Sequence, residues 1–230
     1  MLIHGFQKMT LLDYPSKVAC TLFTAACNLR CPFCHNAGLV TNIENSARID
    51  EEEILSYLKK RQGILDGVCI TGGEPTLQHD LADFIRRVKA LGYAVKLDTN
   101  GTNPAVLQSL LDEGLVDYVA MDIKNSKEKY AATIGMSDYD LAPIQKSIDL
   151  LLEGRVDFEF RTTVVKELHD GDSFRAIGPW IAGAKRYFLQ SFVDRETVLR
   201  GGLHACSEEE LAEFSDLMRP YVPTVAVRGV

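Results

Sequence analysis

Short apolar runs alternate along the whole chain with segments whose apolar residues recur at helical spacing. Residues 18–23 (VACTLF) are rich in β-branched and aromatic side chains, which is typical of a buried strand. Similar runs follow at residues 67–71, 94–98, 117–123, 157–165, 186–190 and 224–227. The pattern therefore predicts about seven strands separated mostly by helices.

The segments between these runs carry helix start and stop signals. Asp50 is a suitable N-cap for a helix that ends near Gly63, and Gly92 and Gly114 are suitable stops for the next two helices. Helical periodicity predicts further segments at residues 80–91, 104–113, 126–133, 143–153, 173–182 and 208–218. Strands and helices thus follow each other in β then α order.

Such alternation favours parallel strands joined by right-handed crossovers, because a tight hairpin cannot connect parallel neighbours. No linker, repeat or low-complexity stretch interrupts residues 1–230. The sequence therefore predicts a single parallel α/β domain, closed or partly closed into a barrel, with an N-terminal arm at residues 1–17 and a loop at residues 24–36.

Composition narrows the possible partners. The 25 Lys and Arg against 32 Asp and Glu give a net charge of −7, and no basic run could follow a nucleic-acid backbone. Neither an apolar run of ~18 residues nor a continuous signal-peptide core is present. We expect a cytoplasmic protein that binds neither nucleic acid nor membrane.

Chemically distinctive residues fall at the carboxyl ends of the predicted strands, where the loops of a parallel barrel form its working site. The strand-end set comprises Cys27, Cys31, Cys34, Gly72, Gly73, Glu74, Asp98, Thr99, Asn100, Asp122, Lys124 and Gln190, together with Arg161, which lies within the strand at residues 157–165. Their common edge predicts one functional site.

Three of the six cysteines, Cys27, Cys31 and Cys34, lie in a single loop with Cys-x-x-x-Cys-x-x-Cys spacing. Thiolates suit iron–sulfur clusters and zinc, and an ordinary [4Fe-4S] cluster takes four of them. Three ligands would leave one iron open to a substrate or cofactor. The remaining cysteines are interpreted as buried structural residues; they are Cys20, Cys69 and Cys206.

A zinc knuckle is the alternative, with His35 or His4 as the fourth ligand. Structural zinc sites usually draw ligands from two separated pairs. A second cysteine pair is missing from the sequence, and His35 directly follows Cys34, which makes joint chelation awkward. The spacing therefore favours the iron–sulfur interpretation.

The segment CNLRCPFC resembles the signature of the radical S-adenosylmethionine enzymes, with Phe33 just before the last cysteine. Residues 5–36 are more narrowly similar to the activating proteins of anaerobic ribonucleoside-triphosphate reductase, and the pyruvate formate-lyase activating enzymes are a related group. Similarity also extends to the segments GGEP, DTNG and MDIK. The resemblance implies a (βα)6 partial TIM barrel, a [4Fe-4S] cluster and S-adenosylmethionine.

The resemblance also implies roles for the strand-end residues. Gly72, Gly73 and Glu74 would form the turn that approaches the methionine part of the cofactor, and Phe33 would contact its adenine. Lys124 and Arg161 would neutralise its carboxylate. The other cofactor-facing residues implied are Asp98, Thr99, Asn100, Asp122 and Gln190, with Asp98 and Asp122 sharing a monovalent cation. Structural ion pairs, core packing and loop hydrogen bonds are the alternatives for these residues.

The activity implied is reductive cleavage of S-adenosylmethionine at the cluster, followed by hydrogen abstraction from a glycine of a partner reductase. Such an activase needs a low-potential electron donor such as a flavodoxin. Two alternatives remain open: a radical enzyme acting on a small molecule, of the deazaguanine-forming type, and a non-enzymatic iron–sulfur or zinc binding module.

Overall fold

The computed structural model describes residues 1–43, 47–195 and 198–229. Contacts within the chain divide it into two compact units. The first unit comprises Met1–Asn28, Gly38–Ala120 and Arg155–Asp157. The second comprises Leu29–Ala37, Met121–Gly154 and Phe158–Val230. The loop that carries the three clustered cysteines therefore begins in the first unit and continues in the second.

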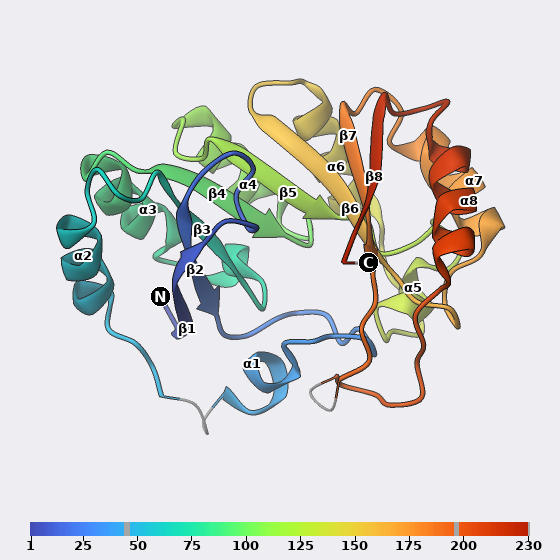
Figure 1. The fold of residues 1–230 in the computed structure, drawn as a ribbon, viewed down its shortest axis with the longest axis horizontal. Helices are drawn as coiled ribbons and strands as arrows, with labels where there is room; N and C mark the ends of the chain where they lie inside the picture. Colours follow the sequence, from blue (N-terminus) through green and yellow to red (C-terminus); the bar gives the residue numbers. More distant parts are fainter. Residues whose placement is uncertain (44–46, 196–197, 230) are drawn as a thin grey trace. The chain divides into compact units, whose positions relative to one another are not determined.

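The strands of the first unit follow each other in chain order, and most of the described pairings among them are parallel (Figure 1). Its strands are β1 (Ile3–Thr10), β2 (Ala19–Thr24), β3 (Gly67–Gly72), β4 (Ala94–Thr99) and β5 (Tyr118–Asp122), which continues into the second unit. Strands β2, β3 and β4 pair in parallel, while β1 pairs antiparallel with β2. This order brings the ends of β2, β3 and β4 to one edge.

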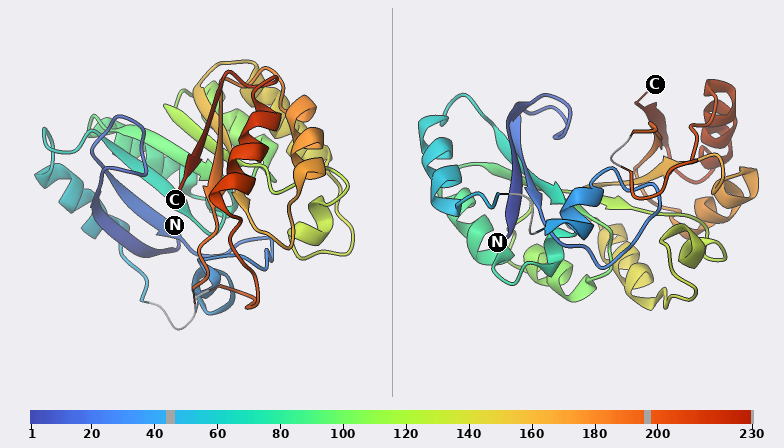
Figure 2. Two further views of the ribbon diagram at one scale, coloured as in Figure 1. Left: turned by 45° about the vertical axis from the view of Figure 1, so that its right-hand side comes forward. Right: turned by 90° about the horizontal axis from the view of Figure 1, so that it is seen from below.

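The helices that periodicity predicted in the first unit are α2 (Glu51–Lys60), α3 (Leu81–Ala90) and α4 (Pro104–Asp112), and each buries one apolar face. Two further elements, α1 (Ala37–Thr41) and the 3₁₀ turn η2 (Pro75–Leu77), were not predicted from the sequence. Asp50 caps α2 by accepting the Glu52 N–H. Gly92 and Gly114 follow α3 and α4 with positive φ, which confirms them as stop signals. Figure 2 shows these helices beside the strands of their unit.

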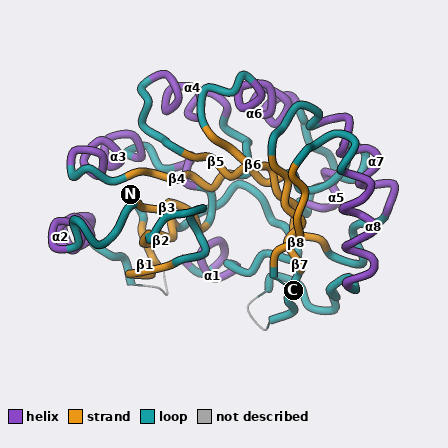
Figure 3. Tube along the Cα trace, turned by 45° about the horizontal axis from the view of Figure 1, so that its top comes forward, coloured by secondary structure: helices purple, strands orange, loops and turns teal. Residues whose placement is uncertain are grey.

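The second unit repeats the alternation with three further parallel strands (Figure 3). Its elements are α5 (Tyr130–Thr133), α6 (Ala142–Leu152), β6 (Asp157–Val164), α7 (Gly171–Trp180), β7 (Arg186–Ser191), α8 (Glu208–Met218) and β8 (Thr224–Arg228). Reciprocal capping boxes begin α7 at Asp170 and α8 at Ser207. The Phe174 and Phe214 rings stack with centroids 4.6 Å apart and join these two helices.

The prediction of an α/β chain with parallel strands is confirmed, but two details of it are wrong. The N-terminal arm contains the strand β1, which pairs antiparallel with β2. The sequence pattern of the arm did not predict this strand. The helix predicted at residues 126–133 forms only over Tyr130–Thr133. Whether residues 1–230 act as a single domain stays a prediction. Among the described residues, no helix is long and apolar enough to span a membrane.

Candidate functional site

In the first unit, the turn after β3 packs directly on the cysteine loop after β2. The Gly73 N–H donates to Thr24 O at 2.7 Å, and the Glu74 N–H donates to Ala26 O at 2.8 Å. A Cβ on Gly73 would lie 2.0 Å from Ala26 O, and one on Gly72, whose φ is +114°, would lie 2.4 Å from the Thr24 backbone. This close backbone contact explains why both positions are glycines, an explanation that the sequence alone did not suggest. Their approach to a cofactor stays a prediction.

Glu74 links this turn to the turn after β4. Its side chain is fully buried and accepts the Thr76 hydroxyl at 2.6 Å, the Thr99 hydroxyl at 2.7 Å and the Asn100 N–H at 2.7 Å. Burial raises the pKa of the Glu74 carboxyl, although these hydrogen bonds oppose the rise. Asn100 in turn places its Nδ2 3.8 Å from Cys27 Sγ. One carboxylate therefore connects both turns to the first cysteine of the loop.

Asp98 has a cationic partner within the same strand. The Lys96 ammonium, on a side chain that is 3% exposed, forms an ion pair with the Asp98 carboxylate. Cys69 Sγ lies 3.8 Å from Asp98 Oδ1 and 3.8 Å from Lys96 Nζ. An ammonium thus already neutralises a carboxylate that the resemblance assigned to a monovalent cation.

In the second unit, the remaining loop cysteines are held by local and long-range contacts. The Cys34 N–H donates to Cys31 O at 3.1 Å, and the Arg30 N–H donates to Ile134 O at 3.1 Å. Phe33 is buried at 4% exposure, and Lys124 Nζ lies 5.9 Å from its ring centroid. A cation near an aromatic face is attractive. The structure therefore gives Phe33 a protein partner, and its contact with adenine stays a prediction.

Asp122 at the end of β5, Lys124 just after it and Arg161 within β6 form one ion-pair cluster. Asp122 Oδ2 lies 2.8 Å from Lys124 Nζ, and Oδ1 lies 2.5 Å from Arg161 Nε. Burial alone would raise the pKa of Asp122, but Arg161 and Lys124 hold it well below its usual range. The carboxylate is thus ionised at neutral pH, and it holds two basic groups close together. Gln190, at the end of β7, is half-buried.

We expect Asp122→Asn to lower the free energy of unfolding by about 3 kcal/mol, because it leaves two partly buried cations without their shared carboxylate. Urea unfolding of the cluster-free protein measures this change. Asp216→Asn is the matched control, since its pair with Arg219 is exposed and is expected to change stability by less than about 1 kcal/mol. Equal effects of the two substitutions would contradict the interpretation.

Cys20, Cys206 and His35 are less suited to binding iron or zinc. Burial raises the pKa of the Cys20 thiol to about 12 and that of Cys206 to about 11, so both stay protonated. His35 Nε2 lies 2.7 Å from Val193 O, and its ring stacks on Phe192. Within the part of the chain described, no three His, Cys, Asp or Glu side chains converge on a point where a single metal ion could bind.

The three loop thiols nonetheless match the donors that an iron–sulfur cluster takes, since such clusters are held by cysteine thiolates. No disulfide joins any of the described cysteines. In the first unit the Asn100 amide lies beside Cys27, and in the second unit the Lys124 ammonium lies over the Phe33 ring. A hydrogen-bond donor and a cation both suit a negatively charged group. The residues present therefore fit a cluster, whereas no described feature supports a separate monovalent cation.

The sequence missed two residues around this site. His169 is buried and places Nε2 2.8 Å from Lys124 O, which fixes the backbone of the loop after β5. Tyr130 lies fully buried in α5 near the same loop. Only helical spacing marked its segment, and nothing in the local sequence distinguishes either residue from ordinary core.

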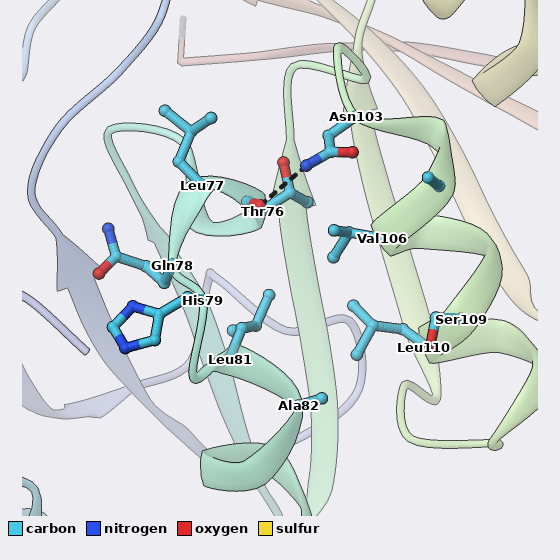
Figure 4. Close-up of a pocket in the computed structure, with 11 residues that line it drawn as sticks. Thr76, Leu77, Gln78, His79, Leu81, Ala82, Asn103, Val106, Ser109 and Leu110 are labelled. Carbon is cyan, nitrogen blue, oxygen red and sulfur yellow. Dashed lines mark hydrogen bonds between the residues drawn. The ribbon is translucent and has the colours of Figure 1, made fainter.

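A separate pocket of about 480 Å³ opens between η2, α3 and α4 in the first unit (Figure 4). Leu81, Val106 and Leu110 supply apolar walls, and Asn103 Nδ2 donates to Thr76 O at 3.1 Å across one end. None of the strand-end residues predicted from the sequence lines it. The pocket adds no titratable cluster to the candidate site.

Comparison with known proteins decides the family. Residues 21–173 match the model of the radical SAM superfamily, a span that includes the cysteine loop and the turns after β3, β4 and β5. The chain belongs to the radical SAM superfamily. It is therefore a radical SAM enzyme, and the family implies a [4Fe-4S] cluster and S-adenosylmethionine as its cofactors.

Individual relatives extend the similarity beyond the family core. A Methanocaldococcus jannaschii protein named as a candidate glycyl-radical enzyme activating enzyme is 32% identical over 235 residues, covering 100% of this radical SAM chain and 96% of its own. The pyruvate formate-lyase-activating enzyme of Clostridium pasteurianum is 31% identical over 128 residues, or 54% of this chain and 52% of that one.

A solved structure confirms the fold class. Native anSMEcpe with bound AdoMet superposes with a TM-score of 0.64 at 19% identity, covering 89% of this chain and 62% of that one. Because so low an identity shows the fold alone, the comparison supports the radical SAM partial barrel and leaves the substrate open.

Proposed function

We propose that this radical SAM enzyme is an activase that generates a glycyl radical on a partner enzyme, with an anaerobic ribonucleoside-triphosphate reductase as the specific partner. The observation that carries the proposal is the similarity along 100% of the chain to the Methanocaldococcus jannaschii protein named for this class of activity. The likeness of residues 5–36 to reductase activating proteins supports the choice of reductase.

The proposed cluster ligands are Cys27, Cys31 and Cys34. When bound, the cluster and S-adenosylmethionine supply a one-electron reductive cleavage that creates a radical able to abstract a hydrogen atom. Lys124 and Arg161 hold positive charge beside the second part of the cysteine loop, where the carboxylate of the cofactor would be neutralised. A low-potential donor such as a flavodoxin would provide the electron.

The first unit contributes rigidity to the proposed site. Glu74 and the glycine pair tie the turn after β3 to Ala26, so the backbone next to Cys27 has little freedom. Asp98, Thr99 and Asn100 follow on the neighbouring strand end, and Phe33 and Gln190 belong to the second unit. These residues, with Asp122, are our proposed cofactor environment.

The test mixes anaerobically reconstituted protein with the reductase, S-adenosylmethionine and a low-potential reductant. We expect the glycyl-radical doublet to appear in the electron paramagnetic resonance spectrum of the reductase. A reductase whose radical-site glycine is replaced by alanine is the control and should show no doublet.

Formation of 5′-deoxyadenosine without any doublet would contradict the activase proposal and favour a small-molecule substrate. Protein that binds zinc alone, at one ion per chain, would contradict the enzyme assignment for this particular chain.

A further inference from the structure

Four large apolar side chains are exposed at one end of the first unit. Met9, Leu11, Leu12 and Ile64 are the most exposed of the large apolar residues that the structure describes, with Leu12 90% and Leu11 71% exposed. Met9 lies near the end of β1, the two leucines lie in the turn between β1 and β2, and Ile64 follows α2. Single exposed apolar residues are ordinary on a protein surface, whereas a group of them marks an interaction site.

The segments that carry these residues lie side by side. The Tyr57 hydroxyl in α2 donates to Lys8 O in β1 at 2.7 Å. The Asp66 N–H donates to Val18 O at 2.7 Å, and the Val18 N–H donates to Asp66 Oδ2 at 2.9 Å. The end of β1, the turn after it and the loop after α2 therefore share one region of the surface.

The turn at residues 11–17 is held in place from inside. Thr10 Oγ1 accepts the Leu12 N–H at 3.2 Å and the Asp13 N–H at 3.4 Å. Tyr14 is buried, and its ring lies 6.1 Å from that of Tyr118. The two exposed leucines therefore sit on a fixed backbone, and a partner that binds them has little chain entropy to overcome.

Basic side chains surround the exposed apolar ones. Residues 8–17 and 57–66 contain five basic residues against two acidic ones, in a chain with a net charge of −7. The Arg61 guanidinium lies 5.3 Å from the centroid of the Tyr57 ring, and Lys60 follows Tyr57 at a spacing that places both on one face of α2. The basic apolar surface is defined as Met9, Leu11, Leu12 and Ile64 with Lys8, Lys17, Lys60 and Arg61.

The basic apolar surface lies at the opposite end of β2 from the cysteine loop (Figure 1). Thr10 pairs with Ala19 at the start of β2, and Ile3 pairs with Thr24 at its end, where the cysteine loop begins. Six residues of extended chain separate the two ends by about 20 Å. A protein bound to this surface therefore leaves the cysteine loop accessible, and substitutions in the surface do not touch the proposed cofactor environment.

The character of the surface indicates the chemistry of its partner. Lysine and arginine side chains around an apolar centre complement an acidic surface that also has an apolar centre. Electron-transfer partners typically meet through small, transient contacts, whereas burial of several large apolar side chains is typical of more stable complexes. An enzyme that must stay bound while it receives a radical fits the second description better than an electron donor does.

We propose that the basic apolar surface binds the partner enzyme that receives the radical, through an acidic surface with an apolar centre on that enzyme. The inference rests on the proposed function and adds the place where the partner is held. Leu12 is the central apolar anchor, because it is the most exposed of the four, and the basic residues guide the acidic partner to it.

The first test replaces Leu12 by glutamate and measures the Kd of the complex with the reductase by anaerobic titration calorimetry. We expect Leu12→Glu to raise the Kd about tenfold or more, because it places a charge where an apolar anchor is buried. Leu12→Met is the matched control and should keep the wild-type Kd. Formation of 5′-deoxyadenosine without the reductase and stability in urea should be unchanged in both variants, since the side chain is exposed.

The second test reverses two charges of the surface together, in Lys8→Glu with Lys60→Glu. We expect weaker binding of the reductase and a smaller dependence of the Kd on sodium chloride than in the wild type. Lys146→Glu with Lys185→Glu is the matched control, because it makes the same change in net charge at exposed lysines of the second unit. The control should keep the salt dependence of the wild type.

The outcomes separate this inference from the proposed function. If the reductase binds and gains its glycyl radical equally well with Leu12→Glu, the surface assignment is overturned and the activase proposal stands. If the wild type forms 5′-deoxyadenosine but does not bind the reductase, both are overturned. Two further results would assign the surface to another occupant and overturn the inference: a wild-type dimer that Leu12→Glu dissociates, or binding to phosphatidylglycerol vesicles that Leu12→Glu abolishes, each with an unchanged Kd for the reductase.

Discussion

Cys31→Ala is expected to abolish formation of 5′-deoxyadenosine. Cys31 is the central thiol of the three and is buried at 7% exposure. Two remaining cysteines cannot hold a [4Fe-4S] cluster whose fourth iron is reserved for the cofactor, because the cluster depends on its thiolate ligands. The measurement is anaerobic reconstitution with iron and sulfide, followed by iron analysis and chromatographic detection of 5′-deoxyadenosine after addition of reductant and S-adenosylmethionine.

The matched control for this variant is Cys206→Ala. The Cys206 thiol is buried just before the Ser207 N-cap of α8 and has a raised pKa, so its loss should leave both the iron content and the activity near those of the wild type. Wild-type activity in Cys31→Ala would refute the cluster ligands proposed above. Loss of iron in Cys206→Ala but not in Cys31→Ala would point to a different ligand set.

Gly73→Ala is expected to lower the free energy of unfolding and the cluster content, because it displaces the backbone of the cysteine loop. This is the second largest effect that we expect. The new methyl group would lie 2.0 Å from Ala26 O, so Ala26 has to move and the Glu74 N–H loses its acceptor. Overpacking costs about 1–3 kcal/mol and a lost hydrogen bond about 1 kcal/mol, which together predict a loss of about 2–4 kcal/mol in unfolding free energy. Because Ala26 directly precedes Cys27, cluster content should fall as well.

Urea unfolding and the iron content after reconstitution measure these two effects. Gly38→Ala is the matched control, since a Cβ there meets no atom within 4 Å and the residue lies inside α1. It should unfold within about 0.5 kcal/mol of the wild type or be slightly more stable. If Gly73→Ala retains both stability and iron, the contact between the turn and the loop does not support the site.

Local patterns were sufficient for most of the helices and strands. The predicted helix at 208–218 has the bounds observed for α8, because a serine cap, an acidic first turn and apolar spacing all act within one segment. Gly92 and Gly114 were recognisable as stops for the same reason. The strand β1 was not recognisable, since its pairing depends on β2, which is its neighbour only in the folded chain.

The residues of the candidate site also divide into those that local sequence patterns indicate and those whose role depends on the fold. Cysteine spacing alone predicted the three loop thiols as cluster ligands, because chelation by one loop is a local property. The family comparison shows the superfamily, and the ligand set stays a prediction. The structure explains the role of other residues through contacts between distant segments. Glu74 matters through Thr99 and Asn100, which lie more than twenty residues away along the chain.

By itself, the sequence determined the alternation of strands and helices, the thiol loop and the family, since each depends on residues close together along the chain. Only the tertiary structure decided why Gly73 must lack a side chain and which cations neutralise Asp98 and Asp122. Those properties arise from packing and from the exclusion of water. Both depend on which distant segments meet, and no local pattern records that.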